Sequence, residues 1–466
     1  TGFGEFANVR ISREHLAQLQ ENLILSHAVG AGEPLPHEVV RAMMALRVNA
    51  LAKGFSGIRL ETVQQLVKML NAGIVPVIPS QGSVGASGDL VQLSHLVLAM
   101  MGKGKAWVGG RGRVPSARLV NAKRALKSAG LKPIRLTAKE GLALINGTQM
   151  MTSYAALAVH QAKILCQTAD VAASISVEAL RGSDTPFDAR IHDVRPYIGQ
   201  QTVASNIRCM MAGSQLRESH RHNDARVQDA YSMRCIPQVH GASRDAVEYV
   251  REKVSIEINS ATDNPLIFAE DKAHLEGGNF HGQPIALAMD FLAIALSELA
   301  NISERRIERL VNGSLSGLPR FLTENGGLNS GMMIAQYTAA SLVSENKVLC
   351  HPASVDSIPT SANQEDHNSM GSISAQKAWK VLKNAQTVLA IELMCACQGL
   401  DFARSLGNGK LMKAGKGTEA AYAYVRSLIP RLRQDRVLHG DIQKLLPAIV
   451  TGVLLRKVDK AIDGVR

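Results

Sequence analysis

Long stretches with helical spacing of apolar residues restrict the folds open to this sequence. The segments Pro284 to Ile302, Met333 to Leu349 and Ser372 to Cys397 are long and helical in pattern. A shorter segment, Glu61 to Gly73, places its apolar residues on one stripe and stops at a glycine, which is typical of a helix with a C-terminal glycine. Helices of such length bury their apolar faces against one another, so the sequence predicts a helical bundle.

The amino-acid composition agrees with a mainly α protein. Of the 466 residues, 46% are hydrophobic and only 4% are aromatic. Alanine, leucine, valine and methionine are plentiful, and this balance favours packed helices over sheets. A chain of this length buries a large core and has room for two or three domains. We therefore expect a globular protein of enzyme size.

The net charge of +12 raises the question of an acidic partner, since 52 Lys and Arg face 40 Asp and Glu. The basic residues are spread along the chain, and no basic run alternates with aromatic side chains on which bases would stack. We therefore expect a solvated basic surface and no nucleic-acid partner.

The cysteine and apolar patterns bear on the cellular compartment. The six cysteines show neither the spacing of a disulfide framework nor that of a zinc ribbon. The most apolar stretch, Ala286 to Ala300, contains Asp290 and Glu298 and is too short to cross a bilayer. No signal peptide is visible. These features predict a cytoplasmic protein that does not enter a membrane.

Polar, glycine-rich segments separate the helical stretches, and we expect the active-site loops among them: Gly82 to Asp89, Gly277 to Pro284, Gly326 to Gly331 and Ser361 to Met370. In Gly82-Ser-Val-Gly-Ala-Ser-Gly-Asp-Leu90, three glycines allow sharp turns. A phosphate loop is excluded because Asp89, rather than a lysine, follows the last glycine. A hydrolase nucleophile elbow is excluded because Gly88 follows Ser87 directly.

The chemistry left open to this loop is closure of its own backbone into a ring. The amide nitrogen of Gly88 can attack the carbonyl carbon of Ala86, because no side chain on Gly88 obstructs it. Loss of water from that adduct and from the Ser87 side chain leaves an imidazolone with an exocyclic methylene, a strong electrophile. Asp89 is placed to assist the dehydration. The alternative is a structural turn around a buried serine.

The segment Gly82 to Leu90 resembles the signature of the MIO enzymes, which are the histidine, phenylalanine and tyrosine ammonia-lyases and the related aminomutases. The similarity extends through nearly all of the chain, in blocks that include Glu140 to Gln149 and Val227 to Gly241. It implies that the prosthetic group is MIO (4-methylidene-imidazol-5-one), formed from Ala86, Ser87 and Gly88, with no external cofactor and no metal.

The resemblance also implies a mainly α fold of the fumarase/aspartase-like lyase architecture. In that fold an N-terminal head carries the MIO loop and is followed by a long central helical bundle. We place the head at residues 1–165 and the bundle at residues 166–466. Enzymes of this kind assemble as homotetramers, so the active sites would be shared between subunits.

Further site residues follow from the same resemblance. Asn146 matches an asparagine beside the prosthetic group and the substrate, with a helix cap as its alternative. Gln228, Tyr231 and Arg234 recur every three residues, so a helical turn would place them on one face. Arg234 would bind the substrate carboxylate, Tyr231 would assist proton movement, and Gln228 would be a hydrogen-bonding neighbour. Phe321 matches a phenylalanine near the prosthetic group, although a buried phenylalanine is more often core.

Two positions bear on the substrate. Glu365 is an extra carboxylate that phenylalanine and tyrosine lyases generally lack, and it can pair with an imidazole or take up its proton. His27, in a Ser-His pair typical of the histidine enzymes, would recognise the imidazole through a ring nitrogen. The implied reaction is elimination of ammonia from L-histidine to give trans-urocanate. A phenylalanine or tyrosine ammonia-lyase, or an aminomutase, is the alternative.

Two features depart from the family pattern. The family's catalytic base is a tyrosine shortly before the Thr-Gly-Phe-Gly block at which this sequence begins, so we expect the numbered chain to omit an N-terminal segment. The alternative is that the protein as given abstracts the proton inefficiently. Val91-Gln92 replaces the usual Ala-Pro, which affects the rigidity of the loop rather than its chemistry. From a different class, a helical scaffold or metal-binding protein would use His220 with His222, or Cys395 with Cys397, as paired ligands.

Overall fold

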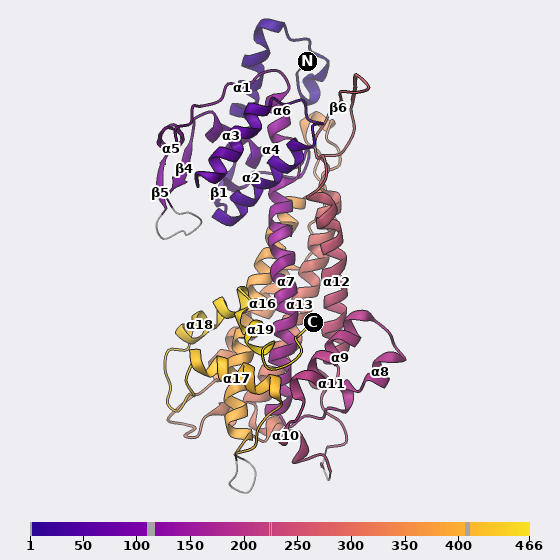
Figure 1. Ribbon diagram of the computed structural model, residues 1–466, viewed down its shortest axis with the longest axis vertical. Coiled ribbons are helices and arrows are strands. Elements are labelled where there is room, and N and C mark those ends of the chain that lie inside the picture. The colour runs from indigo at the N-terminus through magenta and orange to yellow at the C-terminus, as the bar shows by residue number, and fades with distance from the viewer. Residues whose placement is uncertain (1, 110–116, 223, 225, 406–410) are drawn as a thin grey trace. The chain divides into compact units, whose positions relative to one another are not determined.

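The computed structural model describes residues 2–109, 117–222, 224, 226–405 and 411–466. Helices dominate and the strands are few and short (Figure 1), so the predicted mainly α class is confirmed. The chain divides into two compact units, each assembled from three segments. Unit 1 comprises residues 1–157, 250–290 and 352–379, and unit 2 comprises residues 158–249, 291–351 and 380–466. The predicted domain boundary after residue 165 follows chain order rather than packing, and it stays a prediction.

Unit 1 combines short helices with small antiparallel sheets. Helix α2 packs against α3, while α4 packs against α1 and α6. The strand orders in the sheets are β1-β3, β2-β4-β5 and β6-β7. The bounds of these elements are η1 Gly4–Asn8, η2 Arg13–His15, α1 Leu16–His27, β1 Ala31–Pro34, α2 His37–Ala52, α3 Leu60–Asn71, β2 Val75–Pro76, β3 Pro79–Gln81, α4 Leu90–Met100, β4 Lys105–Val108, β5 Arg118–Asn121, α5 Ala122–Ser128, α6 Glu140–Ile145, β6 Leu266–Phe268, β7 Ala273–Leu275 and η6 Ser361–Asn363.

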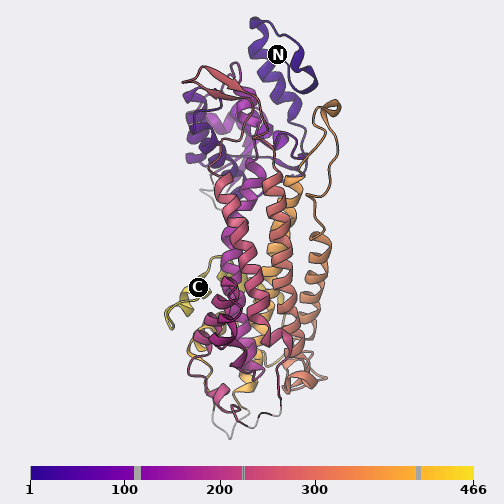
Figure 2. The ribbon, with the colours of Figure 1, turned by 90° about the vertical axis from the view of Figure 1, so that its right-hand side faces the viewer.

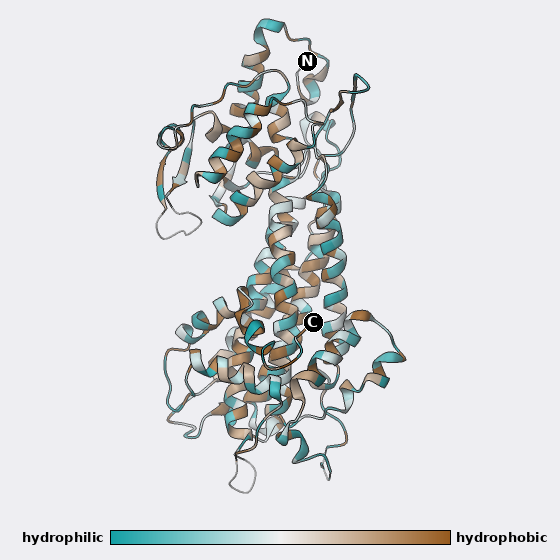
Figure 3. Ribbon diagram, in the orientation of Figure 1, coloured by the Kyte–Doolittle hydropathy of each residue, from teal (hydrophilic) through white to brown (hydrophobic). Residues whose placement is uncertain are grey.

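Helix α3 illustrates how the sequence pattern forms unit 1. Leu66 and Met69 are fully buried, and they lie three residues apart on the inner face of the helix. Gly73 follows the helix with a φ of +68°, the left-handed conformation in which glycine ends helices. The predicted helix from Glu61 is therefore confirmed. Hydrophobic and hydrophilic residues also alternate along α2 and α3 in Figure 3.

Four long helices contribute residues to both units, and their parts within unit 2 run side by side (Figures 1 and 2). They are α7 Gln149–Ala179, α12 Ile236–Glu257, α13 Gln283–Val311 and α16 Gly371–Ala403. The other elements of unit 2 are η4 Thr185–Phe187, α8 Ala189–Asp193, α9 Ile198–Met211, α10 Gln215–Glu218, α11 Tyr231–Arg234, α14 Gly313–Ser316, η5 Arg320–Leu322, α15 Met333–Leu349, α17 Lys416–Leu428, α18 His439–Val450 and α19 Val453–Val458. The three long stretches expected from the sequence are thus confirmed as α13, α15 and α16.

Helix α13 is longer than the apolar stretch from which it was expected. By length and composition it is sufficient to span a membrane, but 67% of its apolar window is buried inside the protein. Its carboxylate Asp290 accepts a hydrogen bond from the Ser354 backbone N–H at 2.8 Å and lies 3.6 Å from Lys377 Nζ. These polar contacts within unit 1 are those of a core helix.

A buried ion pair lies inside unit 2. Arg306 of α13 and Glu392 of α16 have no exposed side-chain surface, and Arg306 Nε donates to Glu392 Oε1 at 2.6 Å. His240 Nε2 lies 3.4 Å from Arg306 Nη1, and His240 Nδ1 lies 2.8 Å from Asp170 Oδ1. Each buried charge therefore has a partner, as a low-dielectric interior requires.

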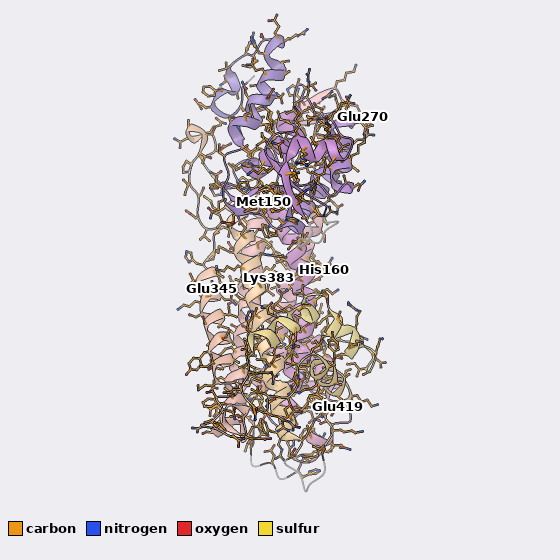
Figure 4. The ribbon with its side chains drawn as sticks, turned by 90° about the vertical axis from the view of Figure 1, so that its left-hand side faces the viewer. Met150, His160, Glu270, Glu345, Lys383 and Glu419 are labelled. Atoms are coloured by element: carbon orange, nitrogen blue, oxygen red, sulfur yellow. The ribbon has the colours of Figure 1, made fainter. Side chains whose placement is uncertain are left out.

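We expect the Glu392→Ala substitution to lower the free energy of unfolding by about 3–5 kcal/mol, because it leaves Arg306 buried without its partner. Chemical denaturation measures the change. The matched control is Glu345→Ala, which removes the surface ion pair between Glu345 of α15, labelled in Figure 4, and Lys380 of α16. Exposed pairs contribute at most about 1 kcal/mol. Equal losses in both variants would contradict the assigned importance of the buried pair.

Candidate active site

The loop from Gly82 to Asp89 turns back on itself. Gly85 and Gly88 form an isolated antiparallel bridge, and both have a φ of +75°. A Cβ atom on Gly88 would overlap the carbonyl oxygen of Gly147, and one on Gly85 would overlap the hydroxyl of Ser369. Glycine is therefore required at both positions, by backbone conformation and by close packing.

Hydrogen bonds fix the peptide groups around the Ala-Ser-Gly triplet. The Gly147 N–H donates to Ser87 O at 3.2 Å, and the Asp89 N–H donates to Gly147 O at 2.8 Å. The Ser83 hydroxyl donates to Gly88 O at 3.1 Å. The Gly88 N–H faces the Gly85 carbonyl across the Gly85–Gly88 bridge, and among the hydrogen bonds of the described residues none engages the Ala86 carbonyl. The peptide groups around the triplet are thus held in place, while the Ala86 carbonyl has no hydrogen-bond partner among the described residues.

Asp89 follows the triplet and is fully buried. Its carboxylate accepts the backbone N–H groups of Met150 and Met151 at 2.8 and 3.0 Å, in the first turn of α7. Met150 is labelled in Figure 4. Burial raises the pKa of Asp89 to about 7, against the opposing effect of these hydrogen bonds. Because this pKa is raised, the protonated form is favoured in the folded chain below about pH 7, where it can donate a proton to a departing hydroxyl.

Glu365 lies close to the triplet, although 278 residues separate it from Ser87. Ser87 Oγ donates to Glu365 Oε1 at 3.4 Å, and Thr360 Oγ1 donates to Glu365 Oε2 at 2.7 Å. Reciprocal backbone hydrogen bonds between Thr360 and Glu365, at 3.0 and 3.3 Å, fix the backbone at the same place. Two side-chain hydrogen bonds therefore orient the carboxylate beside Ser87, and two backbone hydrogen bonds hold the residue that carries it.

The loop before Glu365 has a strained backbone. Ser361, Ala362 and Asn363 have φ values of +50°, +53° and +68°, although none of them is glycine. Each such conformation costs about 1–3 kcal/mol and persists only where its surroundings fix it. Strain of this kind concentrates at functional sites, and here it lies two residues before the carboxylate that faces Ser87.

His27 ends helix α1 and is half-buried. Its Nδ1 lies 3.0 Å from Ser26 Oγ, which also donates to Leu23 O. Burial lowers the pKa of His27, while a hydrogen bond to the Leu23 backbone and the charge of Glu365 oppose the shift. The imidazole is thus neutral near pH 7, and it feels the electrostatic field of Glu365. Unit 1 therefore brings together the two positions on which the substrate prediction rests.

Asn146 occupies the turn between α6 and α7, beside Gly147. Its Nδ2 donates to the Asn264 carbonyl at 2.9 Å, while its Oδ1 is buried without a hydrogen-bond partner. A buried acceptor without a partner is costly, and it marks a place where a ligand atom fits. Asn146 is also the C-cap residue of α6, through its backbone N–H to Leu142 O rather than through its side chain, and it does not cap α7, which begins at Gln149.

Unit 2 contains the other predicted residues. Gln228, Tyr231 and Arg234 line a hollow of about 360 Å³. The predicted helical face is only partly correct, because α11 covers Tyr231–Arg234 and Gln228 precedes it. Asp229, beside Gln228, accepts the Ser183 backbone N–H at 2.6 Å, and this contact holds the chain outside the helix. Shared lining of the hollow, rather than a helical repeat, groups the three residues.

Arg234 and Tyr231 contact each other within this hollow. The guanidinium carbon of Arg234 lies 4.6 Å from the centre of the Tyr231 ring, a cation–π distance. Arg234 Nε is buried without a hydrogen-bond partner, and Tyr231 is 70% exposed. Phe321, in η5, has a left-handed φ of +55°. Both the guanidinium and the phenol therefore have binding capacity that unit 2 leaves unused.

Two residues beside the loop, Arg47 and Gly147, are not among the site residues that the sequence predicts. Arg47 is fully buried and donates to Asn146 O at 2.8 Å, and Gly147 pairs with the reactive loop. The signal for Arg47 was present, because Val39, Met43 and Arg47 recur every four residues and are all buried in α2. A charged residue on an apolar helical face is a candidate for a fixed structural or functional role.

Among the described residues, no three His, Cys, Asp or Glu side chains gather as metal ligands. Of the pairs considered, Cys395 and Cys397 are buried thiols inside α16, and burial raises the pKa of Cys397 to about 12. The His220 ring lies 3.3 Å from the Gly182 carbonyl. The two thiols are therefore packed in the protein core, and the His220 ring contacts a backbone carbonyl.

We expect Gly88→Ala to abolish ring closure, because the new methyl group would overlap Gly147 O and force the reacting backbones apart. The intact mass of the variant would then equal the mass of its sequence. Gly130→Ala is the matched control, since Gly130 has a similar φ of +70° and nothing within 4 Å of an added Cβ. It should lose stability only and still lack two waters. A Gly88→Ala protein lighter by two waters would contradict this account.

Comparisons with known proteins agree with the geometry. The sequence profile of the aromatic amino acid lyase family matches residues 1–427. A histidine ammonia-lyase of Caldanaerobacter subterraneus is 58% identical over 97% of this chain and 86% of its own length. The crystal structure of histidine ammonia-lyase from Trypanosoma cruzi has a TM-score of 0.89 at 48% identity, covering 99% of this chain and 86% of that one.

A tyrosine aminomutase from Streptomyces globisporus is also similar, with a TM-score of 0.90 at 40% identity, covering 99% of this chain and 89% of that one. The profile match and the high identities each extend over most of the sequence. The chain therefore belongs to the aromatic amino acid lyase family and is a carbon–nitrogen lyase.

Proposed function

We propose that this chain eliminates ammonia from L-histidine to give trans-urocanate, with an MIO group formed from Ala86, Ser87 and Gly88 as its electrophile. The observation that carries this proposal is the Glu365 carboxylate beside Ser87, at 3.4 Å. Relatives that are 53–58% identical over nearly the full chain are histidine ammonia-lyases, which supports the same substrate here. When formed, MIO supplies an electrophilic methylene that makes the substrate amine a better leaving group.

Residues of unit 1 would hold the reacting groups. The Gly147 N–H donates to Ser87 O, so it would stabilise negative charge that develops on this oxygen. Asn146 Oδ1 would accept a hydrogen bond from the substrate, which gives this buried atom the partner it lacks. Asp89 would move protons during dehydration, since its pKa of about 7 allows both protonation states near neutral pH.

Glu365 and His27 would select the imidazole of the substrate. A carboxylate and a neutral imidazole offer hydrogen-bonding groups that match the two nitrogens of a histidine ring. A phenyl ring has no such groups and would leave the carboxylate without a partner. Discrimination by unpaired polar groups is strong, so these two residues favour histidine over phenylalanine.

The unit 2 cluster, which consists of Gln228, Tyr231 and Arg234, would bind the amino-acid end of the substrate. Arg234 would pair with the carboxylate through its planar guanidinium, for which Nε is available. Tyr231 would assist proton movement, with Gln228 as its neighbour, and Phe321 would pack near the prosthetic group. We propose that the clusters of unit 1 and unit 2 from different copies of the chain complete one active site.

A homotetramer with shared active sites follows from that proposal. Ile334 and Tyr337 on α15 are 54% and 60% exposed, and Phe291 and Ile294 on α13 are 44% and 48% exposed. Apolar side chains three residues apart on long helices suit burial against further copies of the chain. We also propose a cytoplasmic location, because all six cysteines are free thiols, as in a reducing compartment.

An aminomutase that returns ammonia to the β-carbon is the second candidate, favoured by the 0.90 TM-score to the tyrosine aminomutase. Both activities would use the same electrophile. The product separates them, since a lyase releases an unsaturated acid and a mutase releases a β-amino acid.

We expect purified protein that includes any residues encoded before Thr1 to convert L-histidine into urocanate and to leave L-phenylalanine and L-tyrosine unchanged. Chromatography of the three reactions gives the products. Cinnamate or coumarate would overturn the substrate assignment, and a β-amino acid would overturn the lyase assignment.

We expect Glu365→Gln to lower kcat/KM for histidine by about 10²- to 10⁴-fold, the usual contribution of a positioned acid or base. The reason is that glutamine keeps the shape of the side chain but loses its charge and basicity. Asp366→Asn is the matched control, because this neighbouring carboxylate is exposed, and its kcat/KM should stay within a few-fold. Similar losses in both variants, measured by urocanate absorbance, would remove Glu365 from the proposed role.

A further inference from the structure

Arg47 is an unusual buried cation in unit 1. Its side chain has no exposed surface, and its guanidinium donates to carbonyl oxygens rather than to a carboxylate. The acceptors of Nη1 are Asn146 O at 2.8 Å, Gln149 Oε1 at 2.8 Å and Thr262 O at 3.2 Å, and Nη2 donates to Ala143 O. Among the described residues, no carboxylate lies within ion-pair distance of Arg47.

This cation remains charged despite its burial. Burial lowers the pKa of Arg47 to about 10, and the distant charge of Asp263 opposes the shift. The guanidinium is therefore protonated at neutral pH without the compensation of a contacting carboxylate. A buried charge without a contacting carboxylate lowers the stability of the fold, so Arg47 is expected to have a role that offsets this cost. Its four oxygen partners indicate that role.

The partners of Arg47 converge on the turn that joins α6 to α7. Ala143 O and Asn146 O are carbonyls at the end of α6, where the helix dipole favours a cation. At the opposite side of the turn, the first N–H groups of α7 bind the Asp89 carboxylate. A cation and an anion thus hold the two ends of one short turn.

Gly147 lies in this turn and contacts Arg47 directly. A Cβ on Gly147 would lie 2.5 Å from Arg47 Nη1 and 2.6 Å from Thr262 O. On its other side, the Gly147 N–H donates to Ser87 O, and the Gly147 carbonyl accepts from the Asp89 N–H. Arg47 therefore supports a residue whose backbone pairs directly with the triplet.

We propose that Arg47 is a positioning residue for the formation of the prosthetic group, because it presses the Asn146–Gly147 turn against the Ser87–Gly88 backbone. The inference rests on the proposed function, since it presumes that the triplet cyclises. With the turn fixed, Gly147 keeps its hydrogen bonds to Ser87 O and from the Asp89 N–H, and these bonds hold the backbone on both sides of Gly88. Without it, the Gly147 hydrogen bonds loosen and the reacting atoms lose their alignment.

The step that Arg47 supports balances without an oxidant or co-reactant. Gly88 N bonds to the Ala86 carbonyl carbon, and its proton passes to the carbonyl oxygen. That hydroxyl leaves as water with the proton of Ser87 N. The Ser87 hydroxyl then leaves as a second water with the Cα proton. Proximity governs such a closure, and a misplacement of about 1 Å costs about 10²-fold in rate.

The test measures ring closure separately from folding and from turnover. Arg47→Met and Arg47→Lys are purified from freshly induced cells, and intact-mass spectrometry follows the fraction of protein that has lost two waters over time. We expect closure to slow by about 10²-fold in Arg47→Met. Arg47→Lys should recover part of the rate, because lysine keeps the charge but lacks the planar fork.

Met43→Ala is the matched control, since Met43 is fully buried one turn earlier on the same face of α2. It destabilises unit 1 but leaves every Arg47 hydrogen bond in place. When its melting temperature is lowered as much as that of an Arg47 variant, Met43→Ala should still cyclise at the wild-type rate. The Arg47 variants should cyclise more slowly. If Arg47→Met does not fold, the comparison of Arg47→Lys with Met43→Ala decides.

The outcomes separate the two proposals. If both folded Arg47 variants close the ring rapidly and the wild type also lacks two waters, the role of Arg47 is overturned and the proposed prosthetic group stands. Slow closure in Met43→Ala, equal to that in the Arg47 variants, would make the effect one of stability and would also overturn it. Wild-type protein that retains the full mass of its sequence would instead refute the prosthetic group itself.

Discussion

Two backbone hydrogen bonds between Gly147 and the segment Ser87 to Asp89 hold the chemistry of this lyase in place. They bring the two segments so close that Gly88 has no room for a Cβ against Gly147 O, while Arg47 and Thr262 O leave no room for one on Gly147. In consequence, the carbonyl of Ser87 and the N–H of Asp89 are fixed on either side of Gly88. Under the proposed function, the loop would serve first as the reactant that closes its ring and later as the support of the electrophile.

Opposite charges at two helix ends stabilise this pairing. Asp89 binds the N–H groups at the start of α7, and Arg47 binds the carbonyls at the end of α6. Burial raises the pKa of Asp89 to about 7 and lowers that of Arg47 to about 10, and these shifts express the same cost of placing charge in the interior. The hydrogen bonds at the helix ends offset part of that cost. Because burial raises its pKa to about 7, the Asp89 carboxyl can act as an acid near neutral pH.

The sequence predicted features whose signals are local. The long helices follow from apolar spacing, and the reactive loop follows from three glycines around one serine, so α13, α15, α16 and the loop were all expected. Features set by tertiary contacts were not. Gln228 lies outside its expected helix because Asp229 binds the Ser183 backbone. The partners of Arg47 come from the segments around Asn146 and Thr262, which meet only after folding. The two units likewise combine segments distant in the chain.

The most direct measurement is tandem mass spectrometry of the proteolytic peptide that spans residues 82–90 in the wild-type protein. The account predicts a peptide that is two waters lighter than its sequence, with fragment ions that place the loss on Ala86, Ser87 and Gly88. A peptide of full mass would contradict it, and so would loss of a single water on Ser87 without ring closure.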